Sequence, residues 1–169
     1  MALVGYSARA LQKNIMLTAK GKYSLKALAH LAALDVGATT QALEIADAND
    51  IPKKFLDAIL GELRNAGIVA SRKGPGGGYR LARAPSEIKI GHVIRAIDGP
   101  LAPIACASRT AYQRCRDCKD VEACGVRLLM TRVRDAMSDV LDRVTLADMV
   151  GHAPRRKKVR RRSNRSARR

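Results

Sequence analysis

Thiol chemistry is available in one short segment of this chain, which holds all of its cysteines: Cys106, Cys115, Cys118 and Cys124. Thiolates bind soft metals, and four of them can complete a tetrahedral zinc site or hold the irons of an iron–sulfur cluster. We expect the basic residues among them to lower the thiol pKa values and to offset the negative charge of thiolates; they are Arg109, Arg114, Arg116 and Lys119. The segment predicts a metal-binding or redox-active loop.

The spacing of the cysteines does not select one thiol chemistry. Zinc usually takes closely spaced pairs, whereas only Cys115 and Cys118 are so paired. A cluster, a zinc site and a reversible disulfide all stay open, with the cluster favoured. A thiol redox enzyme is disfavoured because the paired cysteines lack a strand–helix context and a companion general base. No paired carboxylates or Ser/His arrangement indicates other catalysis, so we predict that the chain is not an enzyme.

A second segment with a chemical signature reads RKGPGGGY, from Arg72 to Tyr79. Four glycines and a proline in five residues cost much chain entropy, so the backbone there must turn sharply or lie against something close. Short apolar runs flank it at 68–70 and 79–81, which predicts a hairpin whose tip carries the charges of Arg72 and Lys73. An ordinary hairpin turn is one interpretation, and a DNA-contacting wing is the other.

The chain before the hairpin favours the wing. Helical patterns occupy 18–36, 41–48 and 52–65, and the last two are joined by a short turn. The third has an inward apolar face made of Phe55, Leu56, Ile59, Leu60 and Leu63. A helix pair followed by strand, basic hairpin and strand predicts a winged helix, mainly α with a small β-wing. We expect the third helix to enter the major groove, and the glycine tip to approach phosphates or the minor groove.

Two further helical patterns follow the hairpin, one over 88–98 and a long one from Gly125, before a short capped turn at 145–150. The long helix has one apolar stripe, formed by Leu129, Val133, Ala136, Met137, Val140, Leu141 and Val144. A stripe beyond a compact domain needs a partner. A two-fold mate is favoured because a dimer reads two half-sites, and packing back on its own domain is the alternative.

Composition limits the classes of partner. The chain of 169 residues has a net charge of +17, no tryptophan and 3% aromatic residues, so its core must be aliphatic and its natural partners are polyanions, nucleic acid before membrane. Residues 151–169 are too basic to pack, and we expect a disordered tail that either contacts phosphate or is merely solvated. No apolar run could span a bilayer, which predicts a cytoplasmic protein.

These patterns divide the chain into five parts. We expect an N-terminal extension over 1–15, with Met16 as an alternative start of translation, and a winged helix-turn-helix DNA-binding domain over 16–100. A cysteine-rich cluster-binding loop follows over 101–124, then a dimerisation helix and terminal turn over 125–150, and the basic tail over 151–169. The expected partners are a double-stranded DNA operator and a second copy of the chain, with no membrane and no small-molecule substrate.

Four motifs give the chain a family resemblance over residues 16–150. They are LTAKGKYSL at 17–25, RKGPGGGYRL at 72–81, IGHVIRAID at 90–98 and TLADM at 145–149, together with the cysteine loop. The chain resembles the bacterial winged-helix iron–sulfur regulators of the IscR, NsrR and RirA type. The resemblance implies a dimeric transcription factor, usually a repressor, that senses iron, redox or nitric oxide status through a labile [2Fe–2S] or [4Fe–4S] cluster.

The resemblance also implies which residues of the recognition helix and wing touch DNA: Lys53, Lys54, Phe55, Asp57, Ala58, Arg72, Gly76, Gly77 and Tyr79. Thr40 and Lys73 complete the predicted set of DNA-binding residues. IscR-like members carry polar residues at the positions of Lys54 and Ala58, so the operator sequence does not carry over.

The cysteine loop departs from the family pattern. Cys118 and Cys124 reproduce the second interval of the three-cysteine members, but the first would fall on Tyr112, so Cys106 or Cys115 must take that place. The position of the family's histidine ligand is Arg127, which cannot coordinate a metal. Either the fourth cysteine or another group completes the site. The favoured function is a cluster-gated DNA-binding regulator; the alternative is a constitutive DNA-binding protein with a structural zinc or redox-disulfide loop.

Overall fold

The computed structural model describes residues 17–35 and 37–151, and it is mainly helical with one two-stranded antiparallel sheet, as the sequence predicts. The extension over 1–15, Met16 and nearly all of the basic tail lie outside the described residues. The elements are α1 (Ala19–Ala32), α2 (Ala42–Asn49), α3 (Lys53–Asn65), β1 (Val69–Arg72), β2 (Gly78–Leu81), η2 (Pro85–Glu87), α4 (Ile90–Ile97), η3 (Ala105–Ala107), α5 (Gly125–Arg143) and α6 (Leu146–Gly151).

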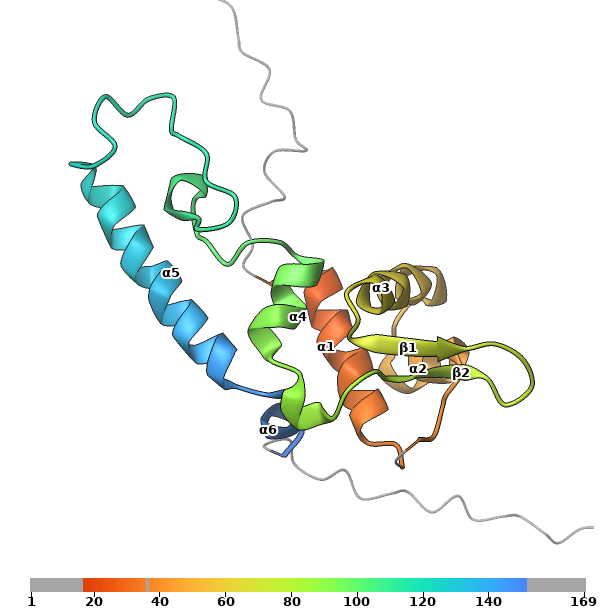
Figure 1. Cartoon of the computed structure of the whole chain (residues 1–169). Helices are drawn as coiled ribbons and strands as arrows, with labels where there is room; N and C mark the ends of the chain where they lie inside the picture. The colour runs from red at the N-terminus through yellow and green to blue at the C-terminus, as the bar shows by residue number, and fades with distance from the viewer. Residues whose placement is uncertain (1–16, 36, 152–169) are drawn as a thin grey trace, which may run out of the picture.

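The core lies where α1, α2, α3 and α4 meet (Figure 1). Helical spacing puts four apolar residues of α3 on one stripe, and all are fully buried: Leu56, Ile59, Leu60 and Leu63. At the start of α1, Thr18 caps the helix by accepting from the amide of Gly21, and its own amide and hydroxyl donate to Asp98 beyond α4. This contact fixes the start of α1 to the end of α4.

Two details of the helices differ from the prediction. Phe55 was expected to face inward, but it lies at the edge of the α3 stripe with 37% of its surface exposed, where its ring packs edge-on against Tyr23 at 5.8 Å. The helical pattern over 18–36 predicts a longer first helix than the structure has, since α1 ends at Ala32 with Ala33 as its C-cap. Gly37 lies in the following turn with φ of +83°.

The helix α5 stands apart from the body, and the residues directly after it are joined to the body by backbone pairing (Figure 1). The amide of Ile90 donates to Val144, and the amide of Leu146 donates to Ile88. Leu146 is fully buried, so α6 packs into the core of the body although it follows α5 in the chain. None of the helices within 17–35 and 37–151 has the length and apolar character that crossing a membrane requires.

Candidate DNA-binding face and cysteine centre

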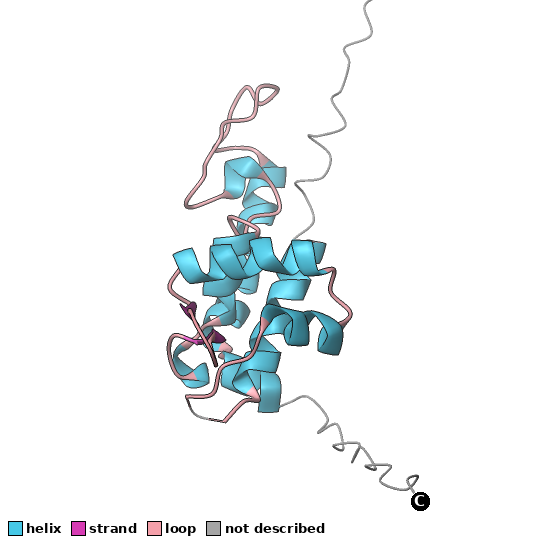
Figure 2. Cartoon of the chain, turned by 90° about the vertical axis from the view of Figure 1, so that its right-hand side faces the viewer, coloured by secondary structure: helices cyan, strands magenta, loops and turns pink. Residues whose placement is uncertain are grey.

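The wing consists of β1, β2 and the tip over 73–77, and it projects from the body on the side away from α5 (Figure 1). The register pairs Val69 with Leu81 and Arg72 with Gly78. Figure 2 looks at this side of the molecule, where the short strands lie among the helices of the body and the cysteine loop extends beyond one end.

The wing is held by the turn before α2. Thr40 and Tyr79 exchange backbone hydrogen bonds of 3.1 and 2.8 Å, so residue 40 acts as a short third strand. Thr40 is buried, and its hydroxyl donates to Glu44 at 2.5 Å. The side chain of Thr40 is therefore buried and hydrogen-bonded within the protein, so Thr40 supports the wing and is not a surface residue.

Two neighbours of Thr40 reach the wing tip itself. The hydroxyl of Thr39 donates to the carbonyl of Gly76, and the side-chain amide of Gln41 donates to the carbonyl of Gly77, each at 2.9 Å. Sequence reasoning missed both contacts, since a polar residue next to a helix start is sufficiently explained by capping. The pattern contains no signal for a bond to a residue more than thirty positions away.

The backbone conformation and internal packing of the wing require its glycines. A side chain at Gly77 would collide with the carbonyls of Arg72 and Gly74, and one at Gly78 would collide with the backbone of Thr40. Gly76 is exposed at a φ of +70°, where a side chain would be strained although nothing lies within 4 Å. Gly77 is buried. Turn geometry and internal packing therefore already explain these glycines, and a close approach to DNA is not needed to explain them.

Basic side chains are exposed on α3 and the wing. The side chains of Lys54, Arg72 and Lys73 make no hydrogen bond or ion pair with any residue that the structure describes. Lys53 pairs with Asp57 across one helical turn at 2.8 Å, which offsets part of the charge of the first turn of α3. Ala58 is exposed on the same helix. The candidate contact residues thus divide into an exposed basic set and a buried supporting set.

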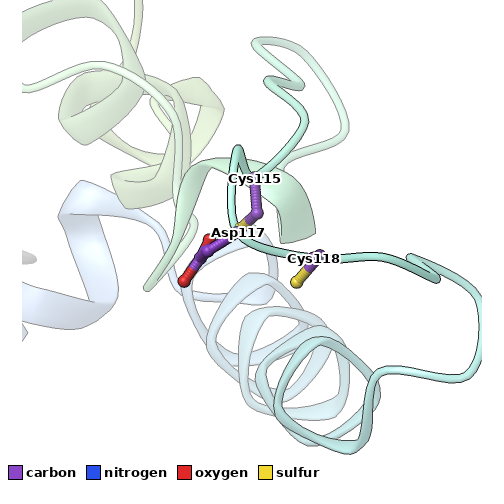
Figure 3. Close-up of side chains that lie close together, drawn as sticks. All are labelled: Cys115, Asp117 and Cys118. Atoms are coloured by element: carbon purple, nitrogen blue, oxygen red, sulfur yellow. The ribbon is translucent and has the colours of Figure 1, made fainter.

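The four cysteines come together, as their clustering predicts. The sulfur of Cys115 lies 3.4 Å from that of Cys106, and the sulfur of Cys118 lies 3.8 Å from that of Cys124. Cys106 is buried, and the other three are partly buried. The ligand atoms of Cys115, Asp117 and Cys118 lie within 4.8 Å of one another and project from one stretch of the loop (Figure 3).

These sulfur distances can be compared with metal coordination. Two thiolates on one tetrahedral metal, with metal–sulfur bonds of about 2.3 Å, lie about 3.8 Å apart. Both sulfur pairs are near that value. Among the described residues, no group of three cysteines has all of its sulfurs within 4.8 Å, so the four sulfurs do not converge on one point. The donor set fits a group with two metal positions better than a single ion.

The thiol pKa values depart from the prediction. Contact with the sulfur of Cys106 raises the pKa of Cys115 to about 12, and contact with Cys124 raises the pKa of Cys118. The expectation that nearby arginines would lower these values is wrong because the sulfurs are one another's nearest partners. The pKa of Cys124 is lowered, chiefly by the backbone amide of Arg127 in the first turn of α5.

The apolar stripe of α5 is covered at one end only. Leu141 and Val144 pack against the body, so the alternative of self-packing applies to the last turns. Leu129 near the start of the helix is 55% exposed, Val140 beside Leu141 is still 61% exposed, and none of the 19 residues of α5 is buried. Most of the stripe therefore lacks a partner within the described part of the chain.

Comparison with known proteins gives this arrangement a context. The model of the Rrf2 family, described as an iron-dependent transcriptional regulator, matches residues 17–152. The chain is 46% identical over 138 residues to a Rhodobacter capsulatus protein named as an rrf2-like HTH-type transcriptional regulator, covering 80% of this chain and 92% of that one. It is 31% identical over 136 residues to the HTH-type transcriptional regulator IscR of Erwinia tasmaniensis, covering 80% and 79%.

Solved structures agree with the sequence comparisons. CymR, the global cysteine regulator of B. subtilis, superposes with a TM-score of 0.67 at 32% identity, covering 82% of this chain and 98% of that one. IscR of T. potens superposes with a TM-score of 0.65 at 27% identity, covering 85% and 91%. These relatives are regulators of transcription and not enzymes. The chain belongs to the Rrf2 family of transcriptional regulators.

Proposed function

We propose that this protein is a homodimeric regulator whose affinity for a DNA operator is set by an iron–sulfur cluster held in the cysteine loop. The observation that carries the proposal is the pairing of four thiol sulfurs at the start of α5, in a chain that also presents a winged helix. DNA contact falls to the exposed basic residues of α3 and the wing, while Thr40 and Gly77 hold the wing in shape.

The cluster proposal assigns one pair of thiolates to each iron. Cys106 and Cys115 would hold one, and Cys118 and Cys124 the other, which favours a [2Fe–2S] cluster over a single zinc ion. When bound, such a group supplies reversible one-electron chemistry and sensitivity to iron supply, oxygen and nitric oxide. The chain's own thiols must lose their protons to bind it, so binding of the group would release protons.

The dimer proposal rests on the uncovered part of the α5 stripe. Exposed apolar residues in a row, among them Leu129, Val133 and Val140, are unusual on a helix that faces water. A second copy of the same helix would cover them with the same residues, because a two-fold interface is self-complementary. The cysteine loop lies at the start of this helix, so a change in the loop would alter how the two copies are spaced.

A second candidate needs no iron–sulfur cluster. The sulfurs of Cys106 and Cys115 are already in van der Waals contact at 3.4 Å, and the chain is also related to CymR, which is named as a cysteine regulator. In that case the loop would form disulfides, or hold structural zinc, on a DNA-binding protein without a cluster.

One anaerobic preparation separates these candidates. Iron, sulfide and zinc are measured in the protein as purified, and binding to the DNA upstream of its own gene is measured with and without the bound metal. We expect two irons and two sulfides per chain, and DNA affinities that differ between the two forms. Stoichiometric zinc without iron would favour the second candidate, and equal affinity in both forms would exclude cluster gating.

The wing is tested by replacing Arg72 with alanine. We expect weaker binding to every DNA sequence and a smaller salt dependence, with the slope of log affinity against log salt reduced by about one, because a phosphate contact releases one counterion. Arg132→Ala, on α5 and far from the wing, is the matched control. A loss confined to one operator position would mean that Arg72 reads a base.

A further inference from the structure

The buried cysteine, Cys106, is attached to α5 by two arginine side chains. The Nε of Arg127 donates to the carbonyl oxygen of Cys106 at 3.1 Å, and a terminal nitrogen of Arg134 donates to the carbonyl oxygen of Ala107 at 2.5 Å. The two arginines are seven positions apart, so they lie two turns apart on the same face of the helix. Together they bind consecutive carbonyls of η3.

The second of these contacts belongs to a closed network. Only 12% of the Arg134 side chain is exposed, and its other nitrogens donate to Asp135 at 2.9 and 2.7 Å. Asp135 also accepts from Arg109, three residues beyond Cys106, at 2.9 Å. A guanidinium this enclosed is unfavourable unless its donors are used. Its use here is to hold the segment that carries Cys106.

The spacing of the cysteines explains why such a hold is needed. Cys115, Cys118 and Cys124 follow one another closely and lead directly into α5, whereas Cys106 is nine residues from its nearest cysteine neighbour. Within the loop, a hydrogen bond of 3.3 Å from the amide of Gln113 to the carbonyl of Ala105 brings the chain before Cys115 back to η3, and the sulfurs of Cys106 and Cys115 lie 3.4 Å apart. The side chains of Arg127 and Arg134 in turn link η3 to α5.

We propose that Arg127 and Arg134 are positioning residues that hold Cys106 in place as the fourth thiol of the site. The proposal rests on the proposed function for its meaning, but its structural content applies equally to the metal-free chain. Arg127 cannot coordinate a metal, and instead it orients the cysteine that can. Because both arginines belong to α5, the placement of Cys106 and the placement of the helix depend on one another.

The test measures the reactivity of each thiol in metal-free, fully reduced protein. The full chain is treated with iodoacetamide, and the alkylation rate of each cysteine is read by peptide mass spectrometry. In the wild type we expect Cys106 to react more slowly than Cys118, which is partly exposed. Arg127→Ala and Arg134→Ala should each speed the reaction of Cys106 by about tenfold, the change that corresponds to losing one hydrogen bond from a charged donor. The rate for Cys118 should stay within about twofold in both variants.

Two further variants keep the test specific. Arg132→Ala, exposed on the same helix without a partner in the described residues, should leave all four rates unchanged. Arg127→Lys, which keeps one cationic donor, should restore most of the protection of Cys106. Equal acceleration of all four thiols would show general loosening, and an unchanged rate for Cys106 would show that the arginines do not hold it; either result overturns the proposal.

The loaded protein gives a second readout. If the anaerobic protein holds a cluster, both alanine variants should lose its visible absorbance faster than the wild type when a chelator is added, with an altered spectrum because the fourth ligand is displaced. If the wild type holds no iron, the proposed function fails while the alkylation rates still decide the role of the arginines.

Discussion

At the residue scale, the wing shows that one residue type can serve three purposes at three consecutive positions. Gly76 allows a left-handed backbone, Gly77 allows the tip to fold against Arg72, and Gly78 allows the strand to approach Thr40. The sequence predicted the sharp turn, because glycine is the usual residue where the chain reverses. It could not predict the contact between Gly78 and Thr40, since the two residues are joined only by the fold.

Replacing Gly77 with alanine tests the internal packing of the tip. The new methyl group would collide with backbone carbonyls, so we expect the free energy of unfolding to fall by about 1–3 kcal/mol. The control is Gly61→Ala in α3, where nothing lies within 4 Å of the new methyl group. It should raise stability by up to about 1 kcal/mol through helix propensity. Urea unfolding measures both; an unchanged midpoint for Gly77→Ala would mean that the tip yields freely.

At the element scale, the joint between α4 and α5 connects the arm to the body. Arg95 of α4 forms two hydrogen bonds with the carboxylate of Asp142 in α5, at 2.6 and 2.8 Å. The ammonium of Lys89 donates to the carbonyl of Arg143, next to the backbone pairing that ends α5. The helical patterns predicted both helices but not this joint, because each of its ionic residues also suits a solvated helix face.

The ion pair predicts a dependence of stability on pH. The Arg95 guanidinium holds the pKa of Asp142 below its ordinary value of 3.8, so the stabilisation is complete above that pH and disappears as the pH falls through the lower folded-state value. We expect Asp142→Asn to reduce the free energy of unfolding at pH 7 by under about 1 kcal/mol, since both partners are partly exposed.

Urea unfolding at a series of pH values measures this effect. The difference between wild type and Asp142→Asn should narrow toward zero below pH 3.8. Asp139→Asn removes the same charge from an exposed position on the same helix and is the control. A difference that stays constant across the acid range would assign the effect of Asp142 to packing against Gly91 instead of to its charge.

At the scale of the whole molecule, a compact body carries one projecting helix, α5, whose apolar stripe is mostly uncovered. The body follows the sequence closely, because a four-residue stripe such as that of α3 leaves few ways to bury its side chains. The sequence predicted that the four cysteines form one site, but it did not predict the hydrogen bonds from α5 to η3. A guanidinium that binds a backbone carbonyl produces no recognisable residue spacing. Phe55 was misplaced because periodicity does not resolve the edge of a stripe.

The uncovered apolar stripe of α5 predicts the effect of a charged residue placed in it. Val140→Asp would put two carboxylates into the proposed two-fold interface. Because each valine contributes about 2 kcal/mol by burial there, the dissociation constant of the dimer should rise by at least about 100-fold. Sedimentation velocity measures the change, with Arg132→Asp as the control. A stable dimer in Val140→Asp would place the interface elsewhere on the molecule.

The hydrogen bonds from residues 39–41 to the wing have a mechanical consequence. A hairpin that is hydrogen-bonded at its tip to the residues before α2 should move together with that helix, so each protomer of the proposed dimer would present DNA with one rigid reading head. In that proposal, a signal that changes affinity would act by changing the separation or tilt of the two heads. Adjusting the operator spacing by one base pair should therefore mimic or cancel the signal, whereas altering the bases under either head should not.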